Sequence, residues 1–426
     1  MSRTQSLKYN KFEIYSNEDS SKFGNISGGT PKVLYRESVL EPSIEISVDV
    51  LETGGAFPDG KTILEGLPLY TTERVQFEIE LDENKVSFKN QDDLRVASIE
   101  NIMESFSNVS YNLKVVSKEA FDNTLCDTRV KRKLEGMIST IVADIIQKDL
   151  GSNKPVFVDP THNSYYDFGG DTSPFGKILE LQTYAIPDGM SGKSAGYLFW
   201  QTSEGFHFKS LDKLFDKKGK YIKKFIENKK PGPPPIGYDG KILQSSRIRS
   251  ISGLDQFETG SYGTILEVFD SVIKKYVRKE PSTPPPEGNG NIAGKKLPTF
   301  HPDLHGKATE KIQIRKNNGG SFSYEDKPER QVEKFTEEDI VVEEVIYQAK
   351  QNFRQKFTTV AEITIPADLS LHAGDLIECD FPGMKLSKTA KKSSRDSGIY
   401  MIADLCHYGD RSQSYTGLRL VRDSFG

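Results

Sequence analysis

Apolar and polar residues alternate in several short stretches of the first quarter of the chain, and this pattern predicts β-strands. Alternation at every second residue places one face of a strand in a core. Gaps rich in Gly and Pro separate the stretches, as in small β-barrels and sandwiches. The predicted strands are residues 44–51, 74–81, 85–89 and 113–117. Residues 1–30 are polar and rich in Ser, Asn and Gly, and are predicted to form an extended arm.

Apolar residues spaced by three and four positions predict helices in the middle of the chain. The third of these helices has the clearest boundaries, because Asp171, Thr172 and Ser173 are its capping candidates, Pro174 suits the first turn and Pro187 ends it. Gly151 stands where the second helix needs a C-cap. The predicted helices are residues 97–106, 128–150, 175–186 and 337–353.

Residues 196–211 are predicted to form an aromatic hairpin near the centre of the chain. An aromatic run ends at Trp200, Gly205 permits the turn, and Phe206 and Phe208 resume the alternation. His207 alternates outward and is predicted to lie on the surface or at an interface. Because a two-stranded hairpin is marginal in water, other elements are expected to cover one of its faces.

The last quarter of the chain again predicts strands, which would form a small barrel closed by the helix 337–353. These strands are residues 359–366, 371–381, 397–408 and 415–424. The segment before them is mixed. Its parts are a lysine-rich solvated stretch at 216–230, a strand at 242–251, a strand or helix at 263–278, and a Pro- and Gly-rich loop at 280–334 that would order on a partner.

The composition is that of an ordinary globular protein and excludes several classes. The 426 residues carry 57 basic and 61 acidic side chains, so a general nucleic-acid-binding surface is not expected. No apolar run approaches the roughly 18 residues of a membrane span, and the N-terminus lacks a signal-peptide core, so we expect neither membrane contact nor export. Three isolated cysteines predict reduced thiols.

Several short stretches match known catalytic or ligand-binding sequence motifs, but the elements predicted around them do not fit those motifs. Residues 55–62 spell a P-loop, yet Gly66 and Pro68 interrupt the helix it needs. Residues 192–196 spell GxSxG without the preceding strand and following helix of a nucleophile elbow. His301 and His305 have a metal-ligand spacing, but Pro302 disfavours a regular helix. We therefore expect no catalytic residue, cofactor or metal site.

Two functional alternatives stay open at this stage. One is a tail-associated peptidoglycan hydrolase that uses carboxylates such as Glu204 or Asp171. The other is a carbohydrate- or nucleic-acid-binding module that uses the lysines between 217 and 230.

Two stretches resemble the baseplate hub proteins of contractile-tailed phages of the T-even type and their cyanophage relatives. This family includes the late-control protein D group and the VgrG spikes of type VI secretion. One stretch is the helix and hairpin from Phe175 to Leu211. The other is the C-terminal set of Ile363-Thr-Ile-Pro, Leu371-His-Ala-Gly-Asp-Leu-Ile, Gly398-Ile-Tyr-Met-Ile-Ala-Asp and Leu418-Arg-Leu-Val-Arg.

The resemblance implies an α+β, β-rich fold with two tube-type β-barrel domains around helix-and-hairpin hub modules. The implied domains are a first barrel at 1–115 with its arm at 1–30, a hub at 116–215, a second hub portion at 216–335 and a second barrel at 336–426. Three chains would form a six-barrel ring between the hexameric tail tube and the trimeric central spike.

The implied partners are two further copies of the chain, the trimeric spike, the tail tube protein and other baseplate proteins. DNA would pass through the lumen without specific binding. The protein would be made in the host cytoplasm and reside in the virion. The residues predicted to serve interfaces are Tyr197, Phe199, Trp200, Phe206, His207, Phe208, Ile363, Ile365, Leu376, Tyr400 and Leu418.

Overall fold

The computed structural model describes most of the chain. The described residues are 7–57, 60–88, 93–189, 195–218, 222–227, 240–249, 264–270, 274–279, 291–295, 301–304, 310–316, 342–383, 395–410 and 412–425, with the single residues 90, 220, 254, 297, 307 and 393. No helix in this part of the chain is both long and apolar enough to cross a membrane.

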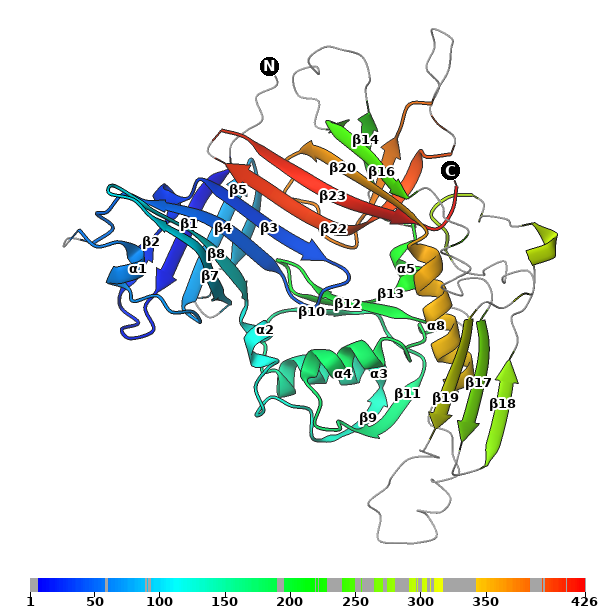
Figure 1. Ribbon diagram of the computed structural model, residues 1–426. Coiled ribbons are helices and arrows are strands. Elements are labelled where there is room, and N and C mark those ends of the chain that lie inside the picture. The colour runs from blue at the N-terminus through cyan, green and yellow to red at the C-terminus, as the bar shows by residue number, and fades with distance from the viewer. Residues whose placement is uncertain are drawn as a thin grey trace.

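One sheet of 15 strands, built from both ends of the chain, dominates the fold (Figure 1). The N-terminal strands are β1 (Lys8–Tyr15), β2 (Phe23–Asn25), β3 (Lys32–Ser38), β4 (Glu45–Glu52), β5 (Arg74–Leu81), β6 (Asn84–Phe88), β7 (Leu94–Glu104) and β8 (Val109–Ser117). The later strands are β14 (Lys223–Glu227), β15 (Lys241–Ile242), β16 (Gln244–Arg249), β20 (Thr359–Pro366), β21 (Leu376–Asp380), β22 (Gly398–Asp410) and β23 (Ser414–Arg422).

The later strands pair around a closed cycle. It runs from β21 through β22, β23 and β20 to β16, and returns through β15 and β14 to β21. Leu243 joins β15 to β16 and donates its N–H to Thr364 O at 2.8 Å, so residues 241–249 act as one closing strand. The predicted closure by the helix 337–353 is therefore wrong. The N-terminal strands pair along an open path among the described residues.

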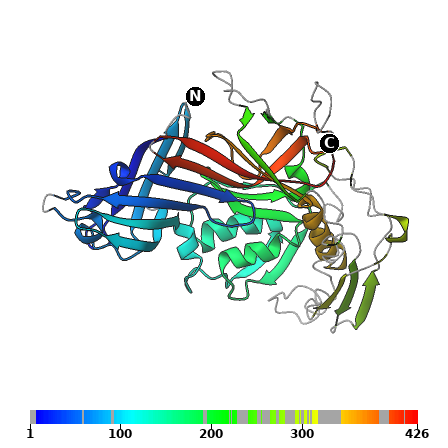
Figure 2. The ribbon, with the colours of Figure 1, turned by 45° about the horizontal axis from the view of Figure 1, so that its top comes forward.

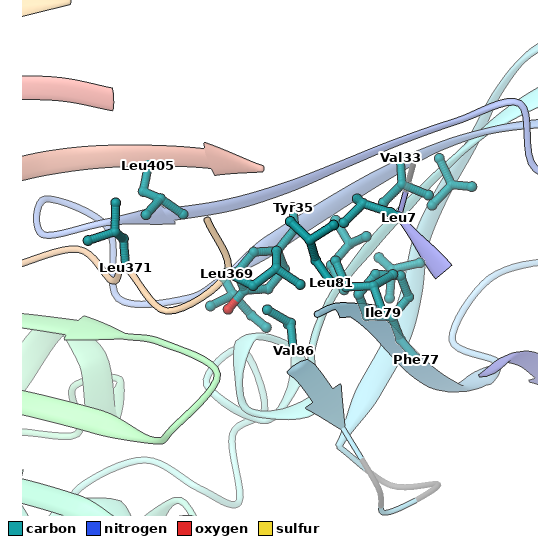
Figure 3. Packing of buried hydrophobic residues seen from close by; sticks show 14 of the residues in the cluster. Leu7, Val33, Tyr35, Phe77, Ile79, Leu81, Val86, Leu369, Leu371 and Leu405 are labelled. Carbon is teal, nitrogen blue, oxygen red and sulfur yellow. The ribbon is translucent and has the colours of Figure 1, made fainter. Parts of the chain in front are cut away.

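The pairing of β3 with β22 joins the two groups of strands. Seven residues of each strand are in register, from Lys32 opposite Asp410 to Ser38 opposite Asp404. Tyr9 of β1 donates its hydroxyl to Gly409 O at 3.1 Å across the same seam. Buried side chains from both groups form one continuous core, in which Tyr35, Val86 and Leu371 are seen together in Figure 3.

The middle of the chain forms a second core beneath this sheet. Its strands are β9 (Lys133–Met137), β10 (Val156–Val158), β11 (Ser164–Phe168), β12 (Tyr197–Gln201) and β13 (Phe206–Ser210), and its longer helices are α3 (Ile138–Asp144) and α4 (Pro174–Leu181). β12 and β13 form the predicted hairpin, and β10 joins β13 in parallel. The short helices α2 (Lys118–Asp122) and α5 (Leu211–Leu214) lie where the chain enters and leaves this middle part, whereas α1 (Ile63–Gly66) lies between β4 and β5.

A third layer lies beside the hairpin. The helix α8 (Val342–Lys356) packs Val345 and Ala349 into the second core. A small sheet of β17 (Thr264–Asp270), β18 (Lys275–Lys279) and β19 (Glu310–Lys316) lies against this helix (Figure 1). Glu310 of β19 forms ion pairs with Lys350 and, at 2.6 Å, with Arg354 of α8.

Several predicted boundaries are confirmed. α4 begins after Ser173, whose hydroxyl accepts from Gly176 N at 3.3 Å, and Pro174 occupies the first turn. Gly151 adopts φ +68° after the helical segment that ends at Asp149, as the residue that ends a helix requires. The helix predicted for 337–353 is α8, and residues 336–341 lie outside the described residues.

Other predictions are wrong for identifiable reasons. Residues 97–104 belong to the strand β7 and residues 105–106 to the turn after it. Bulges at 96/98 and 100/103 break the two-residue alternation of β7 and imitate a helical spacing. The helix predicted for 128–150 begins only at Ile138, because residues 133–137 pair with β11. The predicted arm 1–30 contains β1, which pairs with β5 and buries Phe12 and Ile14.

In the segment between 216 and 334, the pattern was too weak to separate strand from loop. The lysine-rich stretch contains β14, residues 263–278 form the hairpin of β17 and β18, and the predicted long loop 280–334 contains β19. Each of these strands is held by pairing with a partner that is distant in sequence or by the packing of α8. The remaining residues of the predicted loop lie largely outside the described part of the chain.

Replacement of Gly374 by alanine should lower the free energy of unfolding by about 2 kcal/mol or more. Gly374 has φ +94°, and a Cβ there would lie 2.6 Å from Cζ2 of the buried Trp200. Urea denaturation of the purified variant measures the change. Gly28→Ala is the matched control, because a Cβ at Gly28 meets no atom within 4 Å. Equal stability of the two variants would contradict the packing described here.

Candidate functional site

The large sheet, the aromatic hairpin and the loop before β21 meet at the carboxylate of Glu37. Its side chain is fully buried at the end of β3. It accepts hydrogen bonds from Tyr35 Oη at 2.7 Å, Ser203 N at 3.1 Å and Ala373 N at 3.0 Å. His372 Nδ1 lies 3.1 Å from the same carboxylate. One side chain therefore connects residues near 37, 203 and 372.

Glu37 and His372 form a buried ion pair. Burial alone would raise the pKa of Glu37, but the hydrogen bond and positive charge of His372 outweigh it, so that the pKa lies below its usual value. Burial lowers the pKa of His372, but Glu37 more than compensates and raises it to about 9. Glu204 Oε1 lies 3.9 Å from His372 Nε2 on the solvent side. His372 is thus protonated at neutral pH.

Two further histidines lie beside this pair and are neutral at pH 7. His207 stacks between Trp200 and Phe157, with ring centroids at 5.1 and 5.0 Å, and His407 stacks on Tyr35 at 5.9 Å. Burial lowers the pKa of each to about 4. His207 is half-buried, because the rings of Trp200 and Phe157 flank its imidazole, and its predicted role at an interface stays a prediction.

Trp200 fixes the hairpin against the large sheet. Its Nε1 donates to Ala373 O at 3.1 Å, and its ring packs against Gly374. It belongs to an apolar cluster that also contains Met401 and Val421 of the large sheet. This junction can hold parts of the chain together. The Glu37 carboxylate itself is shielded from solvent, because its side chain is fully buried.

The structure places the predicted interface residues mainly in the interior of a single chain. Tyr197, Phe199, Phe206 and Phe208 lie in the second core, Trp200 and Leu376 lie in the cluster between the hairpin and the large sheet, and Ile363, Ile365, Tyr400 and Leu418 lie in the core of the large sheet. His207 is half-buried. Their role at an interface between chains stays a prediction, and it would have to act through the strands that they support.

Most of the described lysines of the lysine-rich stretch have partners within the chain. Lys217 donates to Ala293 O at 2.7 Å and Lys220 to Leu214 O at 3.3 Å. Lys223 pairs with Asp368 at 2.7 Å, and Lys224 pairs with Asp380 at 2.9 Å. Lys229 and Lys230 lie outside the described residues. Intramolecular partners therefore occupy four lysines of the alternative nucleic-acid site.

The carboxylates of the alternative hydrolase do not line one cleft. Glu204 lines a cleft of about 740 Å³ with Asp93 and Glu119, and Asp171 is not among its lining residues. Glu119 is held there by Lys154 Nζ and Ser152 Oγ, each at 2.6 Å. Within the described residues, no group of three His, Cys, Asp or Glu side chains could hold a metal ion, and His305 and the serine of the GxSxG match lie outside them.

Sequence reasoning missed Glu37, the residue at the centre of the junction. Glu37 follows Val33 and Tyr35 at every second position of β3, so it lies on the same inward face. This alternation was the one sequence feature that could have predicted its burial. His372 lies within the C-terminal motif that carried the resemblance, but nothing local links it to Glu37, 335 residues away.

Comparison with known proteins identifies the fold. No family model and no curated protein matches the sequence. The structure is similar to a tail protein from Neisseria meningitidis MC58, with a TM-score of 0.52, 8% identity and coverage of 98% of this chain and 97% of that one. The resemblance to tail proteins predicted from the sequence is thereby confirmed at the level of the fold.

Two other solved structures are also similar to this chain. The 43 kDa tail protein of prophage MuSo2 from Shewanella oneidensis gives a TM-score of 0.48 and 10% identity over 97% of this chain and 98% of that one. An E. coli component of the type VI secretion system gives a TM-score of 0.43 and 8% identity, with coverage of 99% of this chain and 77% of that one.

Replacement of Glu37 by glutamine should lower the free energy of unfolding by about 3 kcal/mol. The variant removes the counter-ion of His372, which must then either stay charged without it or lose its proton. Breaking a buried pair from one side costs about 3–5 kcal/mol. The measurement is urea denaturation at pH 7. Glu41→Gln, an exposed position four residues away, is the control, and a variant E37Q as stable as that control would refute the role of the pair.

The free energy of unfolding should be greatest near pH 6.5 and fall on both sides. Below pH 6.5 the unfolded chain protonates His207 and His407, whereas the folded chain does so only near pH 4, so stability is lost by up to about 2.7 kcal/mol per pH unit. Above pH 6.5 the stabilising proton on His372 is lost as pH approaches 9.

Denaturation midpoints between pH 4.5 and 9 measure this profile. The variant His207→Gln should reduce the slope of the acid limb by about half. An acid limb that His207→Gln leaves unchanged would show that this histidine does not stay neutral in the fold.

Proposed function

We propose that this protein is a structural hub of a contractile phage tail baseplate, working as a homotrimer that joins the hexameric tail tube to the trimeric central spike. The observation that carries the proposal is the pairing of β3 with β22, which unites two groups of strands in one sheet within one chain. The fold shared with a phage tail protein supports a structural role in a tail.

The proposal rests on a problem of symmetry. A sixfold tube and a threefold spike can be stacked only through a component that presents six similar units on one side and three on the other. A chain with two laterally joined strand groups supplies six such units from three copies. In this proposal the first and second barrel domains are the units of the ring, and the hub around the aromatic hairpin faces the spike.

The solvent face of the large sheet suits a channel that DNA crosses without being held. Several of its cations have carboxylate partners, as in Lys114 with Glu45 at 2.7 Å and Arg419 with Asp404 at 3.5 Å. Cations paired in this way release few counter-ions to a polyanion, so they give little sequence-independent affinity. The protein would perform no catalytic step in this role.

The partners in this proposal are the spike, the tail tube protein and other baseplate proteins. The protein would be made in the host cytoplasm and would act in the virion.

Light scattering on the purified protein over a range of concentrations tests the proposal. The expected mass is three times the 47.8 kDa of one chain, either for the protein alone or after addition of a trimeric spike protein. A monomer at every concentration that is unchanged by the spike would overturn the proposed hub. In that event, peptidoglycan zymography would test the alternative function as a peptidoglycan hydrolase.

A further inference from the structure

The tip of the hairpin formed by β7 and β8 exposes three large apolar side chains. Ile102 is 53% exposed, Met103 is 67% exposed and Phe106 is fully exposed. These residues belong to the stripe that the sequence predicted to be the buried face of a helix. Adjacent apolar side chains left in water at a loop tip mark a surface that a partner covers.

The same tip is acidic. Residues 98–108 contain Glu100 and Glu104 and no lysine or arginine. Glu100 accepts only a local hydrogen bond, from Ser98 Oγ at 2.7 Å. The tip therefore presents an apolar surface bordered by negative charge, and its partner should be apolar and positively charged.

The outer face of the small sheet has these complementary properties. Phe269 of β17 and Tyr276 of β18 lie opposite each other and are 46% and 58% exposed, whereas Leu266 and Val268 are buried on the other face. Lys274, Arg278 and Lys311 belong to or directly precede the strands of this sheet. Glu267, which pairs with Arg278 at 3.4 Å and with Lys311 at 2.8 Å, is the one carboxylate among these four side chains, so their net charge is positive. An exposed aromatic pair also suits a methionine, since sulfur packs favourably against rings.

The two surfaces cannot meet within one chain. Figure 1 shows β7 and β8 at the left of the molecule and β17 and β18 at its lower right, with the hairpin layer between them, and Figure 2 keeps the same separation. Two different, complementary surfaces at opposite ends of one molecule make head-to-tail contacts between copies. Such contacts close into a ring when the rotation from copy to copy allows it.

We propose that the β7–β8 tip of one copy docks on the outer face of β17 and β18 of the next copy, and that this contact closes the ring of three chains. The inference rests on the proposed trimer and specifies which surfaces hold it together. Met103 and Phe106 would pack on Phe269 and Tyr276, while Glu104 would face the cations of the small sheet.

The experiment uses two variants of the full chain, each lacking one surface. The variant Met103→Asp with Phe106→Asp removes the apolar tip, and Phe269→Glu removes the receiving surface. All three side chains are exposed, so each variant should fold, which far-UV circular dichroism confirms. Leu125→Asp is the control, because Leu125 is 50% exposed at a site that takes part in neither surface.

Light scattering should show a trimer for Leu125→Asp and a monomer for each of the other two variants, with the dissociation constant raised more than tenfold. An equimolar mixture of the two should form a dimer, because one tip and one receiving surface remain intact in each mixed pair. A mixture that stops at the dimer indicates a head-to-tail contact, because the mixed pair has no second intact tip and receiving surface to which a third copy could bind.

A trimer of the Met103→Asp and Phe106→Asp variant would overturn this inference and leave the proposed hub standing, whereas a monomeric wild type that ignores the spike overturns both. A mixture that stays monomeric would also overturn the head-to-tail contact. Charge reversal gives an independent check: Glu104→Lys should weaken the trimer, and addition of Lys274→Glu in the same chain should restore it.

Discussion

A carboxylate removed from water needs hydrogen-bond donors, and the donors of Glu37 come from three segments of the chain. Tyr35 belongs to the same strand, Ser203 to the hairpin turn and His372 to the loop before β21. A shift of His372 would leave the buried carboxylate unpaired, which costs several kcal/mol, and a shift of Ser203 would remove one of its hydrogen bonds. The hydrogen bonds of Glu37 and the packing of Trp200 together set the relative position of the hairpin and the large sheet.

At the same junction, charge pairing and aromatic packing both hold the hairpin against the large sheet. His372 carries the positive charge that Glu37 requires, whereas burial keeps His207 and His407 neutral. Trp200 covers the pair on the hairpin side and packs on Gly374, where no larger residue fits. The result is a rigid contact between a wide sheet and a helix-containing layer, which suits a component that transmits position rather than one that turns over a substrate.

The large sheet gives the molecule its second constraint. The pairing of β3 with β22 forces residues near 35 and 407 into one core, so neither strand group has a core of its own along this seam. The junction and the seam lie at neighbouring positions of the same strand, because Glu37 follows Tyr35 on the inward face of β3. The strand β3 therefore takes part in two contacts: it joins the N-terminal strands to the later strands through β22, and it joins the large sheet to the hairpin through Glu37.

Local patterns in the sequence determined most of the strands, the aromatic hairpin, α4 with its cap at Ser173, and the resemblance to tail proteins. Alternation, capping and turn formation depend on neighbouring residues, so a single sequence reveals them. The tertiary structure decided that 97–104 is a strand, because bulges changed the spacing of its apolar residues. It also decided that residues 241–249 close the cycle of later strands, and that Glu37 meets His372. The last two features depend on pairs of residues more than a hundred positions apart, and no periodicity within one segment encodes such a pair.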